Sequence, residues 1–350
     1  MRPVYTHHIM KVLVTGGTGF IGSHTVVELQ QAGYEVVAID NFENSSVQVV
    51  SQIQAITGKP FTFIQTDIRN KQALDAVFAA HPDITAVIHF AAYKAVGESV
   101  EKPLAYYENN VGGTANLVEA MQKHGVDKLV FSSSCTVYGN VGPEVLPITE
   151  NSPVVKANSP YGNTKKICEE MLFDVSKSSN TKIVALRYFN PIGAHDSALI
   201  GELPNGVPNN LIPFVTQTAI GIRASLTVFG NDYPTRDGSC IRDFIHVVDL
   251  AKAHVKAIDF LAKNNIPYSV FNIGTGNGNT VLEAIAAFEK VSGKKLNYTI
   301  GPRREGDVVQ IYASCDKAMN ELGWKAERSL ENALETAWKW ELHLAKQQQH

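Results

Sequence analysis

The stretch Lys11–Gly22 reads KVLVTGGTGFIG. Its first five residues form an apolar, β-branched run that is typical of a buried strand. Glycines follow at positions 16, 19 and 22, and residues 24–31 have the pattern of a helix. Such a loop turns tightly, lets the backbone approach a pyrophosphate and aims a helix N-terminus at its charges. The stretch therefore predicts a dinucleotide-binding unit of strand, turn and helix.

An acidic residue at the end of the next apolar run supports this prediction. Residues 35–39 read EVVAI and are followed by Asp40, 18 residues after Gly22. A carboxylate there accepts hydrogen bonds from an adenosine ribose and repels a 2′-phosphate, which favours NAD over NADP. Taken alone, Asp40 could also be a solvated acid at a strand end.

Apolar runs of strand length alternate with helical patterns through the first half of the chain. Further strands are predicted at 61–65, 86–90, 128–131 and 183–186, and helices at 71–80, 109–124 and 161–176. Near-continuous apolar strands separated by helices are typical of a parallel sheet that is covered on both faces. The sequence thus predicts a doubly wound α/β fold of the Rossmann type.

The pattern changes after about residue 190. Residues 194–213 are rich in Gly, Pro and Asn and predict a loop. Beyond it we expect helices at 211–220, 248–261 and from 329 onward, and strands at 225–229 and 270–273. We therefore predict an N-terminal extension at 1–9, an NAD-binding domain at 10–190 and a smaller C-terminal substrate-binding α/β cap at 191–350. Part of the cap region, about 225–275, is expected to return elements to the first domain.

Composition narrows the class of protein. The 350 residues are 44% hydrophobic and 19% charged, as in ordinary globular proteins, and the length predicts about two domains. The formal net charge of −3 gives no basic footprint for nucleic acid or an anionic membrane, and no apolar run reaches the length of a membrane span. The cysteines at 135, 168, 240 and 315 are far apart in the sequence. This spacing is more typical of free cysteines in a reducing compartment than of a disulfide framework or a zinc site. We expect a cytoplasmic protein without a metal site.

A tyrosine and a lysine at helical spacing are candidate catalytic groups. Residues 159–165 read SPYGNTK, with Ser159 as the expected N-cap and Pro160 at the first helical position. Tyr161 and Lys165 are four residues apart and share one helix face. A phenol has a pKa of about 10, and a nearby ammonium together with an oxidised nicotinamide would lower it toward the pH at which general bases work. An ordinary surface Tyr–Lys pair is the alternative.

Ser132-Ser133-Ser134 follows the predicted strand 128–131 and brings hydroxyls to its carboxyl end, although a serine run there is usually turn chemistry. Doubly wound folds bind ligands at this edge of the sheet. Six residues fall at or just after the ends of successive strands: Gly16, Asp40, Asp67, Phe90, Ser134 and Phe189. The sequence therefore predicts one ligand site that collects them.

Longer motifs carry a resemblance to a known family. The G-x-x-G-x-x-G spacing at 16–22 resembles that of the extended short-chain dehydrogenases/reductases. Within that group, residues 11–340 resemble the UDP-glucose 4-epimerase (UDP-galactose 4-epimerase) family. The motifs are FAAYKAVGES at 90–99, SSSCTVYG at 132–139, SPYGNTK at 159–165, RYFNP at 187–191, PNNL at 208–211, VFGNDY at 228–233, RDFIHV at 242–247 and PRREGD at 302–307.

The resemblance implies reversible epimerisation at C4 of UDP-glucose and UDP-galactose in galactose metabolism, through a 4-keto sugar and a tightly bound, recycled NAD, in a homodimer. It implies Tyr161 as the base, Ser134 as the partner of the 4-hydroxyl, and Lys165 as the group that holds the nicotinamide ribose. The NAD contacts, with those of the glycine loop, are Gly16, Gly19, Phe20, Ile21, Gly22, Asp40, Asn41, Asp67, Ile68, Phe90, Ala91, Lys94, Asn109, Ser134, Tyr161, Lys165 and Phe189. The implied UDP-sugar contacts are Lys94, Ser134, Tyr161, Asn190, Asn210, Leu211, Thr227, Phe229, Arg242, Arg304, Asp307 and Ile311.

The residues of this chain agree less well with two other functions and leave a third open. Related nucleotide-sugar 4,6-dehydratases carry Thr-Asp-Glu where this chain has Ser-Cys-Thr at 134–136, so the extra acid and base are missing. A non-catalytic NAD-binding regulator could have lost the tyrosine, the lysine or the arginines, and all are present. Action on UDP-N-acetylhexosamines stays open, because Ile311 is intermediate between the bulky aromatic and the small residue found in relatives. Arg242 and Arg304 could also be structural partners of Asp243 or Asp307.

Overall fold

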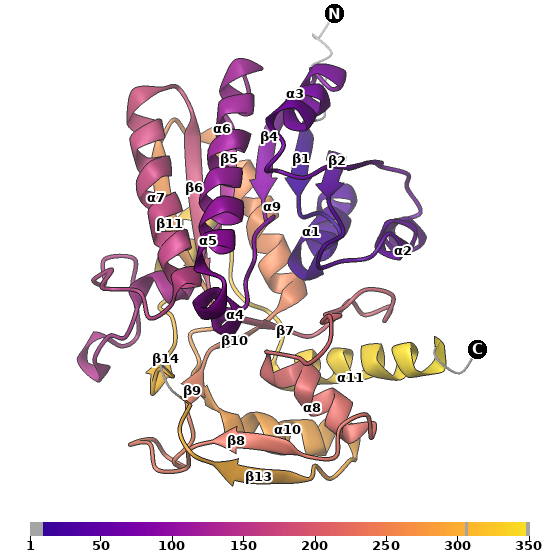
Figure 1. The fold of residues 1–350 in the computed structure, drawn as a ribbon, viewed down its shortest axis with the longest axis vertical. Helices are drawn as coiled ribbons and strands as arrows, with labels where there is room; N and C mark the ends of the chain where they lie inside the picture. Colours follow the sequence, from indigo (N-terminus) through magenta and orange to yellow (C-terminus); the bar gives the residue numbers. More distant parts are fainter. Residues whose placement is uncertain (1–9, 305–306, 348–350) are drawn as a thin grey trace, which may run out of the picture.

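A seven-stranded parallel sheet forms the centre of the molecule (Figure 1). The computed structural model describes residues 10–304 and 307–347, and the strand order is β11-β6-β5-β4-β1-β2-β3. The strands are β1 (Lys11–Thr15), β2 (Glu35–Asp40), β3 (Thr62–Gln65), β4 (Ile84–His89), β5 (Lys128–Ser132), β6 (Lys182–Tyr188) and β11 (Tyr268–Ile273). The order reverses between β1 and β4, and such a switch point opens a ligand crevice at the carboxyl ends of the strands.

Helices cover both faces of this sheet because alternate strand residues face opposite cores. Val12 and Val14 pack in one hydrophobic core, and Leu13 packs in the other. The first core takes residues of α1 (Phe20–Gln31), α2 (Gln48–Thr57) and α9 (Val247–Lys263). The second takes residues of α3 (Lys71–Ala80), α6 (Gly113–Lys123) and α7 (Pro160–Ser178). The predicted doubly wound fold is confirmed.

The first half contains helices that the sequence analysis did not predict. They are α2 and the short helices α4 (Val96–Glu101) and α5 (Pro103–Tyr106), with the 3-10 turns Cys135–Tyr138 and Pro143–Val145. The single helix predicted at 109–124 is two segments, a π-helical turn at Tyr107–Gly112 followed by α6.

The cap has its own small sheets and its own core. Strand β8 (Leu226–Phe229) pairs in parallel with β13 (Tyr298–Gly301). Around them lie α8 (Leu211–Ala219), α10 (Val281–Ser292) and α11 (Leu330–Gln347), and the rings of Phe288 and Trp338 meet edge to face at 5.7 Å. Short strands complete the region: β7 (Asn190–Ile192) with β10 (Phe244–His246), and β12 (Asn279–Thr280) with β9 (Ile241–Arg242) and β14 (Gln310–Ile311). A π-helical turn, Ala318–Leu322, precedes α11.

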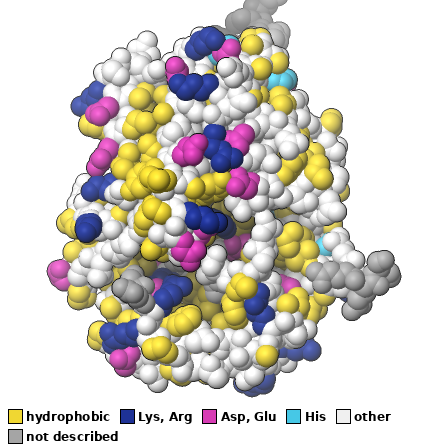
Figure 2. Space-filling view, viewed as in Figure 1, with side chains coloured by type: hydrophobic (Ala, Val, Ile, Leu, Met, Phe, Trp, Pro, Cys, Tyr) yellow, Lys and Arg dark blue, Asp and Glu magenta, His cyan; other side chains and the backbone are white. Residues whose placement is uncertain are grey.

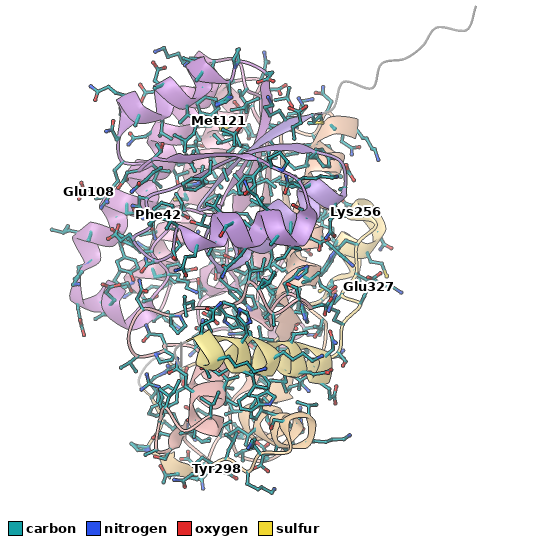
Figure 3. All side chains as sticks on the ribbon, turned by 90° about the vertical axis from the view of Figure 1, so that its right-hand side faces the viewer. Phe42, Glu108, Met121, Lys256, Tyr298 and Glu327 are labelled. Carbon is teal, nitrogen blue, oxygen red and sulfur yellow. The ribbon has the colours of Figure 1, made fainter. Side chains whose placement is uncertain are left out.

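The chain crosses between the two halves more than once. After β8 it returns to the main sheet as α9 and β11, which pack against α1 and pair with β6 respectively. Within the predicted returning segment 225–275, β8 itself pairs with β13 of the cap, so the elements that join the main sheet are those of 247–273. In the turned view, Met121 of α6 and Tyr298 of β13 lie at opposite ends of the molecule (Figure 3).

The predicted extension at 1–9 lies outside the described residues. In the part of the chain that the structure describes, no helix combines the length and the apolar character needed to cross a bilayer. Over the same residues, no cluster of three or more metal-ligating side chains is found.

Candidate active site

A large cavity lies between the carboxyl edge of the main sheet and the cap. Its volume is about 1480 Å³, and its walls run from the glycine loop to Arg304 and Asp307. Figure 2 shows charged side chains of both signs meeting over the middle of this face. Pockets for one small molecule usually measure about 300–1,000 Å³. The cavity is therefore large enough for a dinucleotide and a second ligand together.

Glycine is required at two positions of the loop for different reasons. Gly16 has φ +68°, and a Cβ there would lie 2.8 Å from the Ala91 backbone nitrogen. A Cβ on Gly22 would lie 2.0 Å from the carbonyl oxygen of Gly16. These close approaches bring the first turn of α1 to the cavity wall, where its N–H groups and dipole favour an anion. The arrangement fits a pyrophosphate.

Asp40 ends β2 at the cavity and is held by three donors. The backbone N–H of Phe42 and the Ser45 hydroxyl donate to Oδ1, both at 2.9 Å, and the Thr18 N–H donates to Oδ2 at 3.2 Å. A carboxylate offers about four lone-pair sites. The fixed side chain thus keeps capacity for one more donor, such as a ribose hydroxyl.

Asp67, which was predicted to contact NAD, is not among the residues that line the cavity. Its carboxylate pairs with Arg69 at 2.6 Å and accepts from Asn41 at 3.1 Å. Hydrogen bonds from Arg69 lower the pKa of Asp67 to about 2. Its neighbour Ile68 lines the cavity. In this structure the Asp67 carboxylate therefore binds Arg69 and stabilises the loop around it.

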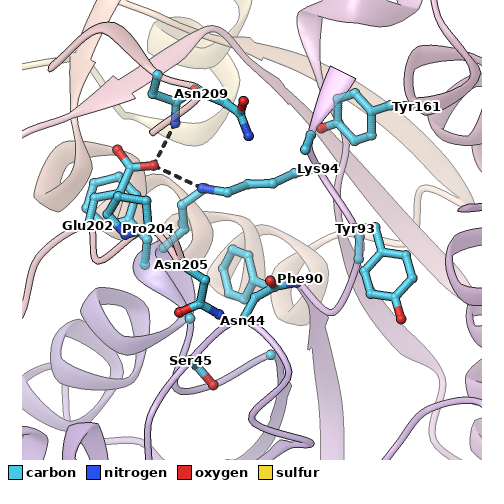
Figure 4. A pocket seen from close by; sticks show the side chains of 18 of the residues that line it. Asn44, Ser45, Phe90, Tyr93, Lys94, Tyr161, Glu202, Pro204, Asn205 and Asn209 are labelled. Carbon is cyan, nitrogen blue, oxygen red and sulfur yellow. Dashed lines mark hydrogen bonds and ion pairs between the residues drawn. The ribbon is translucent and has the colours of Figure 1, made fainter. Parts of the chain in front are cut away.

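The candidate catalytic groups converge where α7 meets the end of β5. Ser159 caps α7 by accepting from the Gly162 N–H at 3.1 Å, which places Tyr161 and Lys165 on its buried face. The Lys165 ammonium donates to the carbonyl oxygen of Ser132 at 2.7 Å. Figure 4 shows Tyr161 and Lys94 among the side chains that line the cavity. The predicted common face of Tyr161 and Lys165 is thus present.

Burial shifts the pKa values of both groups of this pair. Burial raises the pKa of Tyr161, with a further contribution from Tyr188, while a hydrogen bond with Ser134 lowers it. Burial also lowers the pKa of Lys165 to about 8. The lowered tyrosine pKa was predicted for a phenol beside both the ammonium and an oxidised nicotinamide, and it stays a prediction. In this structure desolvation of the phenol dominates, and the Lys165 ammonium donates to Ser132.

The cap side of the cavity carries arginines and an unpartnered amide. Arg242 and Arg304 both pair with Asp307, at 3.2 and 2.8 Å. Of the two roles weighed for these arginines, the ion pair with Asp307 is therefore present, on the cavity wall. Asn190 Oδ1 is buried and has no hydrogen-bond partner among the described residues. A buried acceptor without a partner is unfavourable, and Asn190 is among the residues that line the cavity.

Most of the predicted site residues line this one cavity. They are Gly16, Gly19, Phe20, Ile21, Gly22, Asp40, Asn41, Ile68, Phe90, Ala91, Lys94, Asn109, Tyr161, Lys165, Asn190, Asn210, Arg242, Arg304, Asp307 and Ile311.

Five further predicted residues are not among those that line the cavity: Ser134, Phe189, Leu211, Thr227 and Phe229. Ser134 is buried at the start of the Cys135–Tyr138 turn, where its Oγ accepts from the Thr136 N–H at 3.2 Å. Phe189 packs in a small core with Ile311, and Leu211 packs in the cap core. Thr227 and Phe229 belong to β8, and the Phe229 ring is 43% exposed, with the Arg304 guanidinium 5.8 Å from its centroid.

Comparison with known proteins agrees with this geometry. A family model described as GDP-mannose 4,6 dehydratase matches residues 13–337. The UDP-glucose 4-epimerase of Bacillus subtilis (strain 168) is 54% identical over 333 residues, which cover 95% of this chain and 97% of that protein. The chain belongs to the UDP-glucose 4-epimerase family.

Solved structures of UDP-glucose 4-epimerases share the whole fold. The enzyme of Stenotrophomonas maltophila, with bound NAD and formylated UDP-arabinopyranose, is 47% identical, with a TM-score of 0.94 over 97% of this chain and 99% of that one. The enzyme of Bifidobacterium longum, in complex with NAD+ and UDP, is 47% identical, with a TM-score of 0.91 over 95% and 98%. The resemblance drawn from the motifs is confirmed.

The sequence analysis missed several acidic residues of the cavity wall, and Glu202 is one of them. Glu202 lies in the loop before α8, and its carboxylate accepts from Lys94. The two residues are 108 positions apart, and no spacing or periodicity in the sequence links them.

Proposed function

We propose that this chain is an NAD-dependent UDP-glucose 4-epimerase that interconverts UDP-glucose and UDP-galactose. The observation that carries the proposal is that the acid–base candidates Tyr161 and Lys165 line the same cavity as the glycine loop and the unpartnered Asn190. One cavity thus offers a dinucleotide cradle, a proton-transfer group and a second ligand site. Family membership supports the same conclusion.

NAD fits the half of the cavity that is built by the main sheet. The backbone approach at Gly16 and Gly22 suits its pyrophosphate, and the spare capacity of Asp40 suits its adenosine ribose. A bound NAD would supply a hydride acceptor, and then a hydride donor, beside C4 of the sugar, which allows inversion at C4 without net redox change.

Proton transfer belongs to Tyr161 in this proposal. The buried phenol is protonated at rest because desolvation raises its pKa. It becomes a base for the 4-hydroxyl when positive charge is brought to its oxygen. Ser134, which lowers the pKa of the phenol, would share the proton of the same hydroxyl, and Lys165 would hold the nicotinamide ribose.

In the cap, arginines would bind the diphosphate of the substrate. Arg242 and Arg304 converge on Asp307, which aligns two guanidinium groups along one wall. Guanidinium groups bind phosphate oxygens in a planar, bidentate geometry. The nucleotide is held there and the sugar is held by few contacts. The 4-keto sugar can therefore rotate and present its opposite face between oxidation and reduction.

The deciding experiment is simple. Purified protein should convert UDP-galactose to UDP-glucose with no oxidant or reductant added, and the reaction should stop at the same equilibrium from either side. A protein that binds NAD and turns over neither sugar would be the non-catalytic regulator instead, and the proposal would be wrong.

The range of sugars depends on Ile311. Its side chain is buried in the cavity wall and packs against the core that also holds Phe189. We propose the unacetylated UDP-hexoses as the main substrates, with N-acetylated ones as the alternative. Relative kcat/KM for UDP-galactose and UDP-N-acetylgalactosamine, in the native chain and in Ile311→Gly, distinguishes them.

We also propose a cytoplasmic homodimer. All four cysteines are free, which suits a reducing compartment. Val100 on α4, Leu104 on α5 and Phe173 on α7 are exposed apolar side chains on helices that contact one another, and they offer a candidate interface. Light scattering of the native chain and of Leu104→Glu tests this assignment.

A further inference from the structure

The Glu202 carboxylate joins two residues that come from opposite halves of the cavity. Its Oε1 accepts from the Lys94 ammonium at 3.1 Å and from the Asn210 amide at 2.6 Å. Figure 4 shows this carboxylate between the lysine and the loop that leads to α8. The Glu202 side chain is only 11% exposed, whereas that of Lys94 is 60% exposed. The contacts therefore form at the wall of the cavity.

Lys94 and Asn210 come from opposite halves of the cavity. Lys94 follows β4, and its ammonium lies 5.9 Å from the centroid of the Phe20 ring, at the start of α1 where the pyrophosphate is expected. Asn210 precedes α8 on the cap side, where the UDP-sugar is expected. A carboxylate that holds both side chains ties the position of one ligand group to that of the other.

Contacts on both sides fix the backbone around Glu202, and they thereby fix the position from which its side chain extends. The Trp340 indole N–H of α11 donates to the Glu202 carbonyl oxygen at 2.9 Å. Gly201 forms a bridge with Ala194, and a Cβ on Gly201 would lie 2.5 Å from the Trp340 ring. The next part of the loop is held as well, because the Asn205 amide donates to the Glu43 carbonyl oxygen at 3.1 Å. The loop thus spans the cavity and is anchored on both sides.

A carboxylate at Glu202 is unexpected in a cavity that binds phosphates, because both groups are negative. The proposed function brings two diphosphates into this cavity, and a carboxylate in its wall repels them unless a cation neutralises it. Lys94 supplies that cation, and although its side chain is 60% exposed, the contact fixes its ammonium at the wall of the cavity.

We propose that Glu202 is a positioning residue that couples the dinucleotide half of the cavity to the UDP-sugar half through Lys94 and Asn210. This inference rests on the proposed function. Removing the carboxylate frees the lysine and the amide, weakens ligand binding on both sides, and leaves the proton transfer at Tyr161 unchanged.

The test measures binding and turnover separately in Glu202→Gln and Glu202→Ala. We expect KM for UDP-galactose to rise about tenfold in the alanine variant and less in the glutamine variant, since a hydrogen bond to a charged group contributes on that order. We expect kcat to change less than KM, and release of bound NADH, followed by its fluorescence, to become faster. In a double-mutant cycle with Lys94→Met, the two effects should not add.

A matched control is Glu119→Gln, which removes the same charge from an exposed ion pair with Lys71, 2.7 Å long, outside the cavity. The control should leave KM, kcat and NADH release unchanged. Unchanged KM and NADH release in Glu202→Ala would overturn the inference, as would a fall in kcat alone or additive effects with Lys94→Met. Absence of turnover in the native chain would instead disprove the proposed function, and UDP and NADH binding would still report on the coupling.

Discussion

Arg187 and Glu169 form an ion pair inside the protein, directly behind the candidate catalytic groups. The Arg187 Nε lies 3.0 and 3.2 Å from the two carboxylate oxygens, and both side chains are 8% exposed. Glu169 also accepts from the Ser133 hydroxyl, next to Ser134, and lies one helical turn after Lys165. The pair therefore fixes β5, β6 and α7 to one another beneath the site.

Removing one member of this pair should destabilise the fold. In Arg187→Met the Glu169 carboxylate is left buried without its cation, and such a loss lowers the free energy of unfolding by about 3–5 kcal/mol. Urea denaturation followed by circular dichroism measures it. The control Lys71→Met, in an exposed pair, should change stability by less than about 1 kcal/mol. Replacing both partners, in Arg187→Met/Glu169→Leu, should recover part of the loss, and a double variant no more stable than the single one would contradict this account.

Tyr161→Phe should remove most of the turnover. Loss of a general acid–base group lowers kcat by about 10²–10⁴-fold. The ring and its packing stay, so the fraction of protein purified with NAD should be unchanged. Tyr298→Phe, on exposed strand β13 of the cap, is the control and should keep full activity. Near-normal kcat in Tyr161→Phe would show that another group moves the proton.

Acid should destabilise the protein through buried histidines such as His89. Burial lowers the pKa of His89 to about 3, and its ring is held between the Thr15 and Thr114 hydroxyls at 2.6 and 2.9 Å. An unfolded histidine has a pKa of about 6.5. Between these values the unfolded chain binds a proton that the folded chain does not, so stability falls as pH falls below 6.5, by up to about 1.4 kcal/mol per pH unit.

The variant His89→Gln tests this assignment. Its free energy of unfolding should fall less between pH 7 and pH 5 than that of the native chain, whatever its stability at pH 7. His343→Gln is the control, because it also removes one histidine, in this case a half-buried one on α11. Equal pH dependence in the native chain and His89→Gln would mean that folding does not lower the pKa of His89.

Gly22→Ala should lose bound NAD as well as stability. The new Cβ would lie 2.0 Å from the Gly16 carbonyl oxygen, so the loop or α1 must move. Gly112→Ala is the control, because its φ of −61° suits any residue and its Cβ would meet no atom within 4 Å. It should keep NAD and gain up to about 1 kcal/mol. Normal NAD content in Gly22→Ala would show that this glycine spacing is not needed for binding.

Local patterns predicted the parts of the fold that local physics determines. The strand at 11–15, the glycine loop and the α7 cap at Ser159 each depend on neighbours in sequence, and the structure has them where they were expected. Helix α10 was also open to prediction, because Thr280 and Glu283 form a capping box at its start. The signal was present and was not used.

The rest depends on residues that meet only after folding. Nothing near Lys94 indicates that its carboxylate partner is Glu202, and the raised pKa of Tyr161 follows from burial that tertiary packing creates. The π-helical turn at 107–112 interrupts a sequence with ordinary helical character. Such features require the coordinates because pairing and desolvation are properties of the whole molecule.

The return of the chain as α9 and β11 has a consequence for dissection of the protein. A fragment that stops near residue 190 would lack the outer neighbour of β6 and expose the α1 surface that α9 covers. It would present an unpaired hydrophobic edge and should aggregate rather than fold as a free cofactor-binding module. The two halves are thus built as a single cooperative unit, and a ligand that stabilises either half should raise the melting temperature of both.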